Sequence, residues 1–119
     1  MRTAIGRLKR RTEFLQVAAS RRKYVTPGLV LQVMRRPDSE GPPRVGFTAT
    51  RKLGGAVVRN RARRRLRAAA QAVLPVAAAP GYDYVLIARA GTITRPWTLL
   101  LEDLRKAIEA LTSRRPTAK

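Results

Sequence analysis

Apolar residues along the chain fall into short segments that predict β-strands. Residues 29–34 (LVLQVM) form an apolar run that ends at a proline-rich surface loop, residues 35–43. In residues 44–50 apolar side chains alternate with glycine and threonine, so one face suits a core and the other carries little bulk. Residues 84–89 (YVLIAR) are apolar on both faces, which favours a central strand. Residues 24–25 (YV) predict a further, shorter strand.

Apolar residues spaced three and four apart predict three helices. The first is capped by Thr12 and carries Glu13 in its first turn, where a carboxylate interacts well with the helix dipole. The second covers residues 56–74 and ends before Pro75, since proline cannot donate a backbone hydrogen bond. The third has Pro96 at its first position and buries a stripe made of Trp97, Leu100, Leu101, Leu104, Ile108 and Leu111.

The order of these elements is helix, three strands, helix, strand, helix. It predicts an α+β fold, a single small domain with an about four-stranded mixed sheet and helices packed on it. The predicted domain covers residues 1–111, with a loose segment at residues 1–11, and residues 112–119 form a disordered basic tail. The strand–helix–strand unit around residues 56–74 can be a crossover within one sheet, for which the general rule gives a right hand.

The balance of charge points to a polyanionic partner. The chain of 119 residues has 26 Lys and Arg against 7 Asp and Glu, a net charge of +19. Because such a surface repels itself until an anion neutralises it, nucleic acid is the favoured partner and an anionic membrane surface the lesser one. Most of these residues are arginine, whose forked guanidinium binds phosphate at two points. The apolar runs are too short to span a membrane and the N-terminus lacks a secretory signal, so we expect a cytoplasmic protein.

The second predicted helix concentrates this charge. On a helix, Val58, Ala62, Leu66, Ala69 and Val73 form one narrow apolar stripe, and the remaining arc carries Arg59, Asn60, Arg61, Arg63, Arg64, Arg65 and Arg67. No acid lies between Lys52 and Val76, so these cations repel one another, at a few tenths of a kcal/mol per pair. A bound polynucleotide would remove that cost and release counterions, and Asn60 can contact a base edge or a sugar hydroxyl. Gly54 and Gly55 either admit a phosphate to the helix N-terminus or form only a tight turn.

The acidic residues do not form a catalytic or metal-binding set. Asp38 and Glu40 lie in the proline-rich loop, and the last helix carries Glu102, Asp103 and Glu109 as solvent-facing partners of Arg105 and Lys106. The chain has no cysteine for a thiolate zinc site and no histidine to act as a general base. We therefore predict no catalytic residue and no metal ligand in the protein itself.

One stretch of the chain resembles the signature of the bacterial ribonuclease P protein subunit. The family carries a Lys-x-x-Gly-x-Ala-Val-x-Arg-Asn-Arg pattern followed by further basic residues. It is matched here by Lys52, Gly54, Ala56, Val57, Arg59, Asn60 and Arg61, then Arg63, Arg64 and Arg67. Residues 44–52 (RVGFTATRK), residues 83–89 (DYVLIAR) and the opening with Leu8, Lys9, Glu13, Phe14 and Val17 are also similar to the family. The resemblance covers residues 8–111.

The resemblance implies a cofactor role in tRNA maturation. Members of the family partner a large catalytic RNA, and the ribonucleoprotein removes the 5′ leader of precursor tRNA. Magnesium bound to the RNA carries out the hydrolysis, so the protein alone is expected to be inactive, to bind no cofactor of its own and to join the RNA as one monomer. The implied fold is like the second domain of ribosomal protein S5, with a left-handed βαβ crossover that departs from the general rule.

The resemblance also implies two sites. The arginine helix faces the catalytic RNA through Lys52, Arg59, Asn60, Arg61, Arg63, Arg64 and Arg67. A cleft between the first helix and the sheet holds the single-stranded leader and is lined here by Phe14, Val17, Ala18, Gln32, Thr48, Thr50, Arg51 and Lys52. Relatives often carry aromatic residues where this chain has Ala18 and Gln32, so Phe14 is left as the main ring for base stacking, worth about 1–3 kcal/mol. The alternative is that Phe14 is an ordinary core residue under the first helix.

Two other classes of protein share the strong positive charge. A structural RNA-binding protein of the ribosomal kind does not require the pattern in residues 44–67. A DNA-binding module can place a basic helix in the major groove, but the chain shows neither a second helix in helix-turn-helix spacing nor a signal for dimers.

Overall fold

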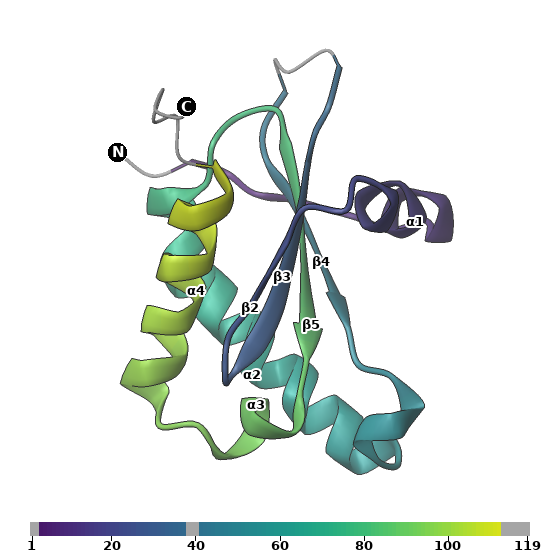
Figure 1. Ribbon diagram of the computed structural model, residues 1–119, viewed down its shortest axis with the longest axis vertical. Coiled ribbons are helices and arrows are strands. Elements are labelled where there is room, and N and C mark those ends of the chain that lie inside the picture. Colours follow the sequence, from purple (N-terminus) through teal and green to yellow (C-terminus); the bar gives the residue numbers. More distant parts are fainter. Residues whose placement is uncertain (1–2, 38–40, 113–119) are drawn as a thin grey trace.

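A five-stranded mixed sheet organises the part of the chain described by the computed structural model, residues 3–37 and 41–112 (Figure 1). Its strands are β1 (Gly6–Arg7), β2 (Lys23–Val25), β3 (Leu29–Arg35), β4 (Arg44–Thr48) and β5 (Tyr82–Ala88), in the order β1-β4-β5-β3-β2. β4 runs parallel to β1 and β5, whereas β3 is antiparallel to β5 and β2. The α+β fold and the central place of β5 are confirmed, with one strand more than expected.

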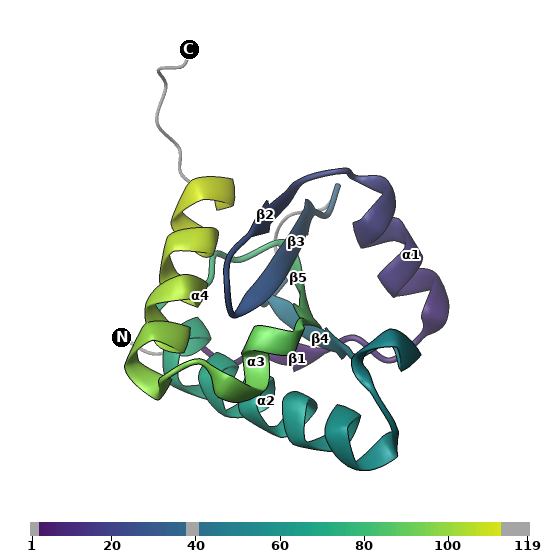
Figure 2. The same ribbon diagram turned by 60° about the horizontal axis from the view of Figure 1, so that its bottom comes forward.

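The helices cover the two faces of the sheet unequally (Figure 2). They are α1 (Arg11–Ala19), the 3₁₀ turn η1 (Arg51–Leu53), α2 (Ala56–Ala77), α3 (Ala90–Thr94) and α4 (Trp97–Thr112). α2 and α4 pack together on one face, and α1 lies alone on the other. The β4–α2–β5 unit joins two neighbouring parallel strands through a helix, as expected for a crossover.

Each face of the sheet has its own core. The larger core lies under α2 and α4 and includes Leu31, Leu66, Tyr84 and Leu104, all fully buried. The smaller one lies under α1 and consists of Leu8, Val17 and Val85, with Phe14, Met34 and Ile87 packed against it. Neighbouring β5 residues therefore serve opposite cores, since Tyr84 belongs to the larger core and Val85 to the smaller. Burial of Tyr84 raises the pKa of its hydroxyl to about 12.

Two short elements were not expected, and both lie where the sequence pattern is too brief to see. β1 has only two residues and falls in the segment expected to be loose, yet its pairing with β4 extends the sheet. α3 has five residues and lies between β5 and α4. Of the predicted disordered tail, Thr112 is the last residue of α4, and residues 113–119 lie outside the described residues.

Two predictions about helix ends were wrong. Thr12 does not cap α1, which begins at Arg11; instead the Glu13 carboxylate accepts the backbone N–H groups of Lys9 and Arg10 at 2.8 and 3.0 Å. α2 continues through Pro75 to Ala77, because a proline in the last turn removes only one helical hydrogen bond. The carbonyl of Pro75 accepts the N–H of Thr3 at 2.7 Å, which ties the N-terminal segment to α2.

Two predictions of buried side chains were also wrong. Val58 is 36% exposed in the first turn of α2, which extends past the strands in Figure 1. Trp97 is 39% exposed at the first residue of α4, where the guanidinium of Arg65 lies 5.8 Å from its ring. The remainder of each stripe is buried or partly buried as predicted, since it faces the sheet or the other helix.

Two buried aspartates hold distant parts of the chain together. Asp83 on β5 pairs with Arg36 at 2.6 Å and with Arg44 at 2.7 Å. Asp103 on α4 pairs with Arg95 at 2.9 Å and accepts the backbone N–H of Gly28 at 3.0 Å. The prediction that Asp103 faces solvent was therefore wrong, because the turn before β3 covers it.

Candidate nucleic-acid interface

The exposed side of α2 carries a row of cations. Asn60, Arg61, Arg64 and Arg67 are exposed, and Arg59 and Arg63 are half-buried. Among the described residues, no arginine of α2 takes part in an ion pair. Arg63 donates a hydrogen bond to Oδ1 of Asn60 at 3.2 Å, and this contact leaves the charge uncompensated. The structure thus gathers the residues predicted to bind the catalytic RNA along one helix, with Lys52 just before it in η1.

Arg65 is the exception on this helix. Its Nη1 donates to the carbonyl oxygens of Thr92 at 2.7 Å, Ile93 at 3.1 Å and Arg95 at 2.7 Å. These carbonyls lie at the end of α3, where a cation compensates both the free acceptors and the helix dipole. Arg65 is therefore occupied by the protein, whereas sequence reasoning had grouped it with the repelling arginines.

The backbone before α2 supports one of the two interpretations of its glycines, that of a tight turn. Gly54 has φ +149°, a backbone conformation that favours glycine, so the tight turn itself requires it. Gly55 has an ordinary φ of −75° and forms the N-cap without a side-chain hydrogen bond. Nothing lies within 4 Å of the position that a Cβ of Gly55 would occupy. Phosphate binding at this helix end stays a prediction.

On the other face of the sheet, Phe14 lies directly on Gly46. A Cβ built on Gly46 would stand 2.5 Å from the Phe14 ring, so only glycine lets the ring approach β4 this closely. Phe14 is half-buried and packs against the small core. It is therefore a packing residue under α1, and part of its surface remains accessible. Val17 is fully buried, so it belongs to the small core under α1 and does not line a cleft.

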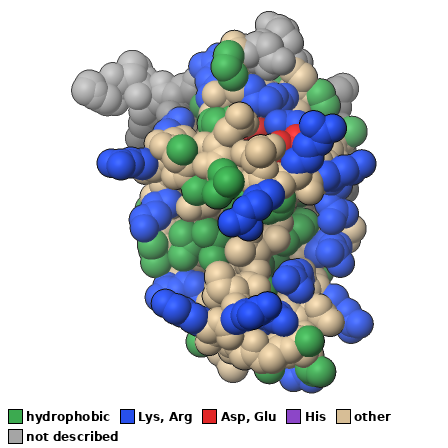
Figure 3. Space-filling view, turned by 90° about the vertical axis from the view of Figure 1, so that its right-hand side faces the viewer, with side chains coloured by type: hydrophobic (Ala, Val, Ile, Leu, Met, Phe, Trp, Pro, Cys, Tyr) green, Lys and Arg blue, Asp and Glu red, His purple; other side chains and the backbone are tan. Residues whose placement is uncertain are grey.

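The other residues of the predicted cleft lie in two groups. Ala18 and Gln32 line a pocket of about 280 Å³ together with Arg21, Arg22 and Lys23. Thr48 ends β4, and exposed Thr50, Arg51 and Lys52 follow it into η1. Figure 3 shows this side of the molecule, with Lys and Arg side chains spread around a central hydrophobic patch.

Arg21, Arg22 and Lys23, which line this pocket, are not among the site residues predicted from the sequence. Three consecutive basic residues were the signal that could have marked them. Arg22 donates to the carbonyl of Leu111, which joins α4 to β2. Arg21 adopts φ +61° and is exposed, as is Lys23.

The described residues hold no group of three or more His, Cys, Asp or Glu that could bind a metal ion. Glu13 is engaged instead of free, since its hydrogen bonds from the N–H groups of Arg10 and Lys9 lower the pKa of its carboxyl, helped by nearby Arg44. The hydrogen bond to Asp83 raises the pKa of Arg44. Among the described helices, none is long and apolar enough to cross a membrane.

Comparison with known proteins gives a consistent result. A family model described as ribonuclease P matches residues 4–112. The chain is 48% identical over 112 residues to the ribonuclease P protein component of Paramagnetospirillum magneticum, covering 92% of this chain and 84% of the relative. It is 53% identical over 102 residues to that of Gluconacetobacter diazotrophicus, covering 86% and 87%.

Solved structures give the same fold. The ribonuclease P protein of Staphylococcus aureus superposes with a TM-score of 0.72 at 20% identity, covering 89% of this chain and 94% of that one. The protein from Thermotoga maritima superposes with a TM-score of 0.69 at 23% identity, covering 84% and 92%.

Proposed function

This chain belongs to the ribonuclease P protein family, and we propose that it binds RNA through two surfaces, the exposed side of α2 and the side of the sheet that carries α1. Its function is that of the protein cofactor in tRNA 5′ processing, as a subunit of the ribonuclease P holoenzyme. Its partners are the ribonuclease P RNA and precursor tRNA. The family match spans residues 4–112, so neither a ribosomal-type protein nor a DNA-binding module is favoured.

In this proposal the RNA subunit, and not the protein, carries out the cleavage. The RNA subunit with magnesium cleaves the leader, and one protein monomer per RNA in the cytoplasm assists binding. Three of the described acids are bound by other groups of the protein. Asp83 and Asp103 are buried against arginines, and Glu13 holds the start of α1. These contacts give each of the three carboxylates a structural role.

One observation carries the assignment of α2 to the catalytic RNA. Exposed Arg61, Arg64 and Arg67 have no acidic partner among the described residues, although arginines elsewhere in the chain do. Burying the apolar side of α2 against the sheet holds these guanidiniums on a rigid support. A folded RNA supplies phosphates that neutralise them and releases its counterions, which gives binding that weakens steeply with salt.

The α1 side is assigned to the single-stranded leader. Phe14 offers a partly open ring for one base, and the basic pocket at Arg21 and Lys23 offers charge for the backbone. Arg51 and Lys52 in η1 extend that charge toward the start of α2. Stacking on an aromatic ring tolerates any base, which suits a leader of variable sequence.

Reconstitution tests the whole proposal. The protein is mixed with a bacterial ribonuclease P RNA and precursor tRNA at moderate magnesium concentration, and the released leader is measured. We expect the protein to increase cleavage by the RNA and to show no cleavage alone. Cleavage by the protein without RNA would contradict the division of labour.

The α2 surface is tested by the triple change Arg59→Ala, Asn60→Ala and Arg61→Ala. We expect weaker assembly with the catalytic RNA, and a slope of log affinity against log salt smaller by about 1.5 for two lost phosphate contacts. The matched control is Arg105→Ala with Lys106→Ala, which removes the same charge from the exposed side of α4. Equal effects of the two variants would mean that net charge, and not the α2 surface, sets the affinity.

The leader surface is tested at Phe14. Because the ring also packs in the small core, Phe14→Leu is preferred to alanine, since it keeps an apolar side chain and removes the stacking surface. We expect weaker binding of precursor tRNA with little change for mature tRNA. Equal losses for both would remove leader stacking from the proposal.

A further inference from the structure

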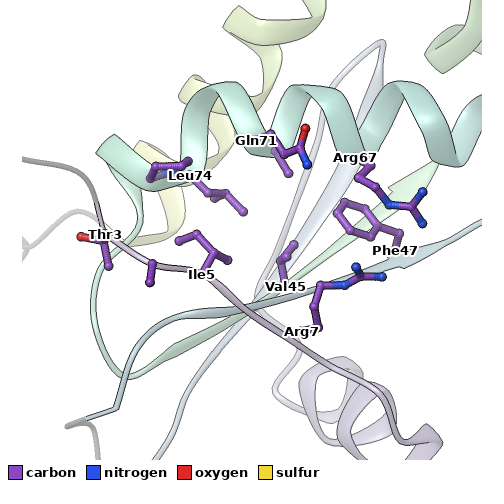
Figure 4. A pocket seen from close by; sticks show the side chains of 11 residues that line it. Thr3, Ile5, Arg7, Val45, Phe47, Arg67, Gln71 and Leu74 are labelled. Atoms are coloured by element: carbon purple, nitrogen blue, oxygen red, sulfur yellow. The ribbon is translucent and has the colours of Figure 1, made fainter.

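A pocket of about 440 Å³ lies on the face of the sheet opposite to α1, between β1, β4 and the second half of α2 (Figure 4). The position that a Cβ of Gly46 would occupy faces Phe14. The side chains of its neighbours Val45 and Phe47 therefore lie on the opposite face of the sheet, where they line this pocket. The volume is within the range of small-ligand sites. It is separate from the predicted leader cleft, because the sheet lies between them.

The pocket has an apolar floor and a polar rim. Its floor is formed by Ile5, Val45, Phe47, Ala70 and Leu74, and its rim includes Thr3, Arg7, Arg67 and Gln71. Such a pocket suits a ligand with a flat, largely apolar ring whose polar groups lie at the pocket entrance.

Two guanidiniums share one end of this pocket. The Cζ atoms of Arg7 and Arg67 lie 5.8 and 5.7 Å from the centre of the Phe47 ring. Both side chains are exposed, and neither has an acidic or hydrogen-bonding partner among the described residues. In Figure 4 both guanidiniums lie beside the Phe47 ring. Both cations therefore lie against the same ring, and an anion bound beside it would be attracted to both.

The ligand that satisfies both parts is a nucleotide. An inorganic anion would neutralise the arginines but leave the apolar floor empty, and a purely apolar group would leave the arginines unneutralised. A nucleobase fits the floor as a flat ring, its phosphate reaches the guanidiniums, and the amide of Gln71 offers both a donor and an acceptor to a base edge.

We propose that this pocket holds one unstacked nucleotide of the catalytic RNA. The base lies on the apolar floor, and its phosphate lies between Arg7 and Arg67. The proposal rests on the proposed function, which brings that RNA to the exposed side of α2. Arg67 belongs to that side and also forms the rim, so a strand that follows α2 reaches the pocket without crossing the sheet.

Direct binding to the free full-length protein is the first test. Nucleoside 5′-monophosphates are titrated while amide NMR signals are followed, with the matching nucleosides and inorganic phosphate as separate arms. We expect shifts at Ile5, Phe47 and Gln71, and binding about tenfold weaker for the nucleoside and for phosphate alone. Equal binding by phosphate alone would reduce the site to a simple anion patch, and equal binding by the nucleoside would remove the role of the arginines. Either result would overturn the proposal.

Substitutions then place the site in the complex. Gln71→Ala and Arg7→Gln change exposed residues, so folding is expected to survive. Their matched controls are Gln16→Ala on α1 and Arg105→Gln on α4, which are also exposed. Chemical probing of the bound RNA is expected to show one nucleotide that the native protein protects and that the two pocket variants expose about tenfold more.

The two proposals fail in different ways. If the α2 triple variant loses RNA but the pocket variants leave every protected nucleotide unchanged, the pocket proposal is wrong and the proposed function stands. If nucleoside monophosphates bind the pocket but the protein does not assemble with the catalytic RNA, the proposed function is wrong. A nucleotide that is exposed equally by the control variants would also refute the pocket assignment.

Discussion

Arginines have different roles in two regions of this molecule. Around the ends of the sheet, Arg44 and Arg95 lie half-buried against aspartates that the fold has removed from water. Along α2, Arg61 and Arg64 are exposed and have no acidic partner among the described residues. The side chain is the same, so the position of the few acids decides which arginines stabilise the fold and which remain for a ligand.

This difference explains how a chain with a charge of +19 folds and still binds a polyanion. The buried aspartates Asp83 and Asp103 each use more than one donor, so a small number of acids satisfies several structural cations. The remaining charge is placed on a helix whose other side is anchored in the larger core. If this separation is real, substitutions in the two regions must affect stability and RNA binding in opposite ways.

The largest loss of stability is expected at Asp83. Asp83→Asn keeps the shape of the side chain but removes the charge that Arg36 and Arg44 share, and breaking a buried pair typically costs about 3–5 kcal/mol. We expect about 3 kcal/mol, since the Arg44 side chain is 29% exposed and water can partly replace its partner. Urea denaturation measures the change.

Glu109→Gln on the exposed side of α4 is the control for Asp83, because it removes one negative charge without breaking a buried contact. It should leave the free energy of unfolding nearly unchanged. Equal losses for the two variants would indicate that net charge, not the buried pair, sets the stability.

Arg65 gives the next largest effect and tests the division within one helix. Arg65→Gln removes a charged donor from three carbonyl oxygens at the end of α3, and we expect about 2 kcal/mol of destabilisation in urea. The RNA affinity of the folded variant should fall less than that of Arg64→Gln, which removes an exposed neighbour. A larger loss of RNA affinity for Arg65→Gln would place Arg65 in the RNA-binding surface.

The contrast between Arg64 and Arg65 also marks how far the sequence predicts this protein. Long, clear patterns were identified correctly, because α2 and α4 repeat their apolar spacing over several turns and β5 is a continuous apolar run. The uniform charge of α2 predicted its exposed side for the same reason. The use of Arg65 was not predictable, because it depends on α3, a five-residue helix that lies about 27 residues away in the chain.

The same limit applies to Asp103 and to the nucleotide pocket. Asp103 is one of three acids on its helix, and it differs from the solvent-facing ones through its contacts with Arg95 and with Gly28, which is 75 residues distant. The pocket needs β1, whose two residues show no periodicity. Contacts between distant segments are set by packing, which local patterns of a single sequence do not contain.

Glu13 should show a smaller effect that depends on pH. The pKa of its carboxyl in the folded protein lies below the ordinary value of 4.5. The contribution of Glu13 to stability is therefore fully present above pH 4.5, and it is lost as the pH falls through the pKa of the folded state. We expect Glu13→Gln to lower the Tm modestly at pH 7 and the difference from the native protein to vanish under more acidic conditions. A difference in Tm that is the same at both pH values would contradict this assignment.

The smallest change in stability is expected on α2, where it has the opposite sign. Arg61→Gln combined with Arg64→Gln removes two cations that repel their neighbours, so the free energy of unfolding should stay the same or rise by a few tenths of a kcal/mol. The affinity for the catalytic RNA should fall at the same time, with a weaker dependence on salt. A substitution that raises the free energy of unfolding and lowers the RNA affinity is expected where cations repel one another in the free protein and bind phosphates in the complex. Destabilisation as large as that of Arg65→Gln would mean that these arginines also serve the fold, and the separation between the two regions would be lost.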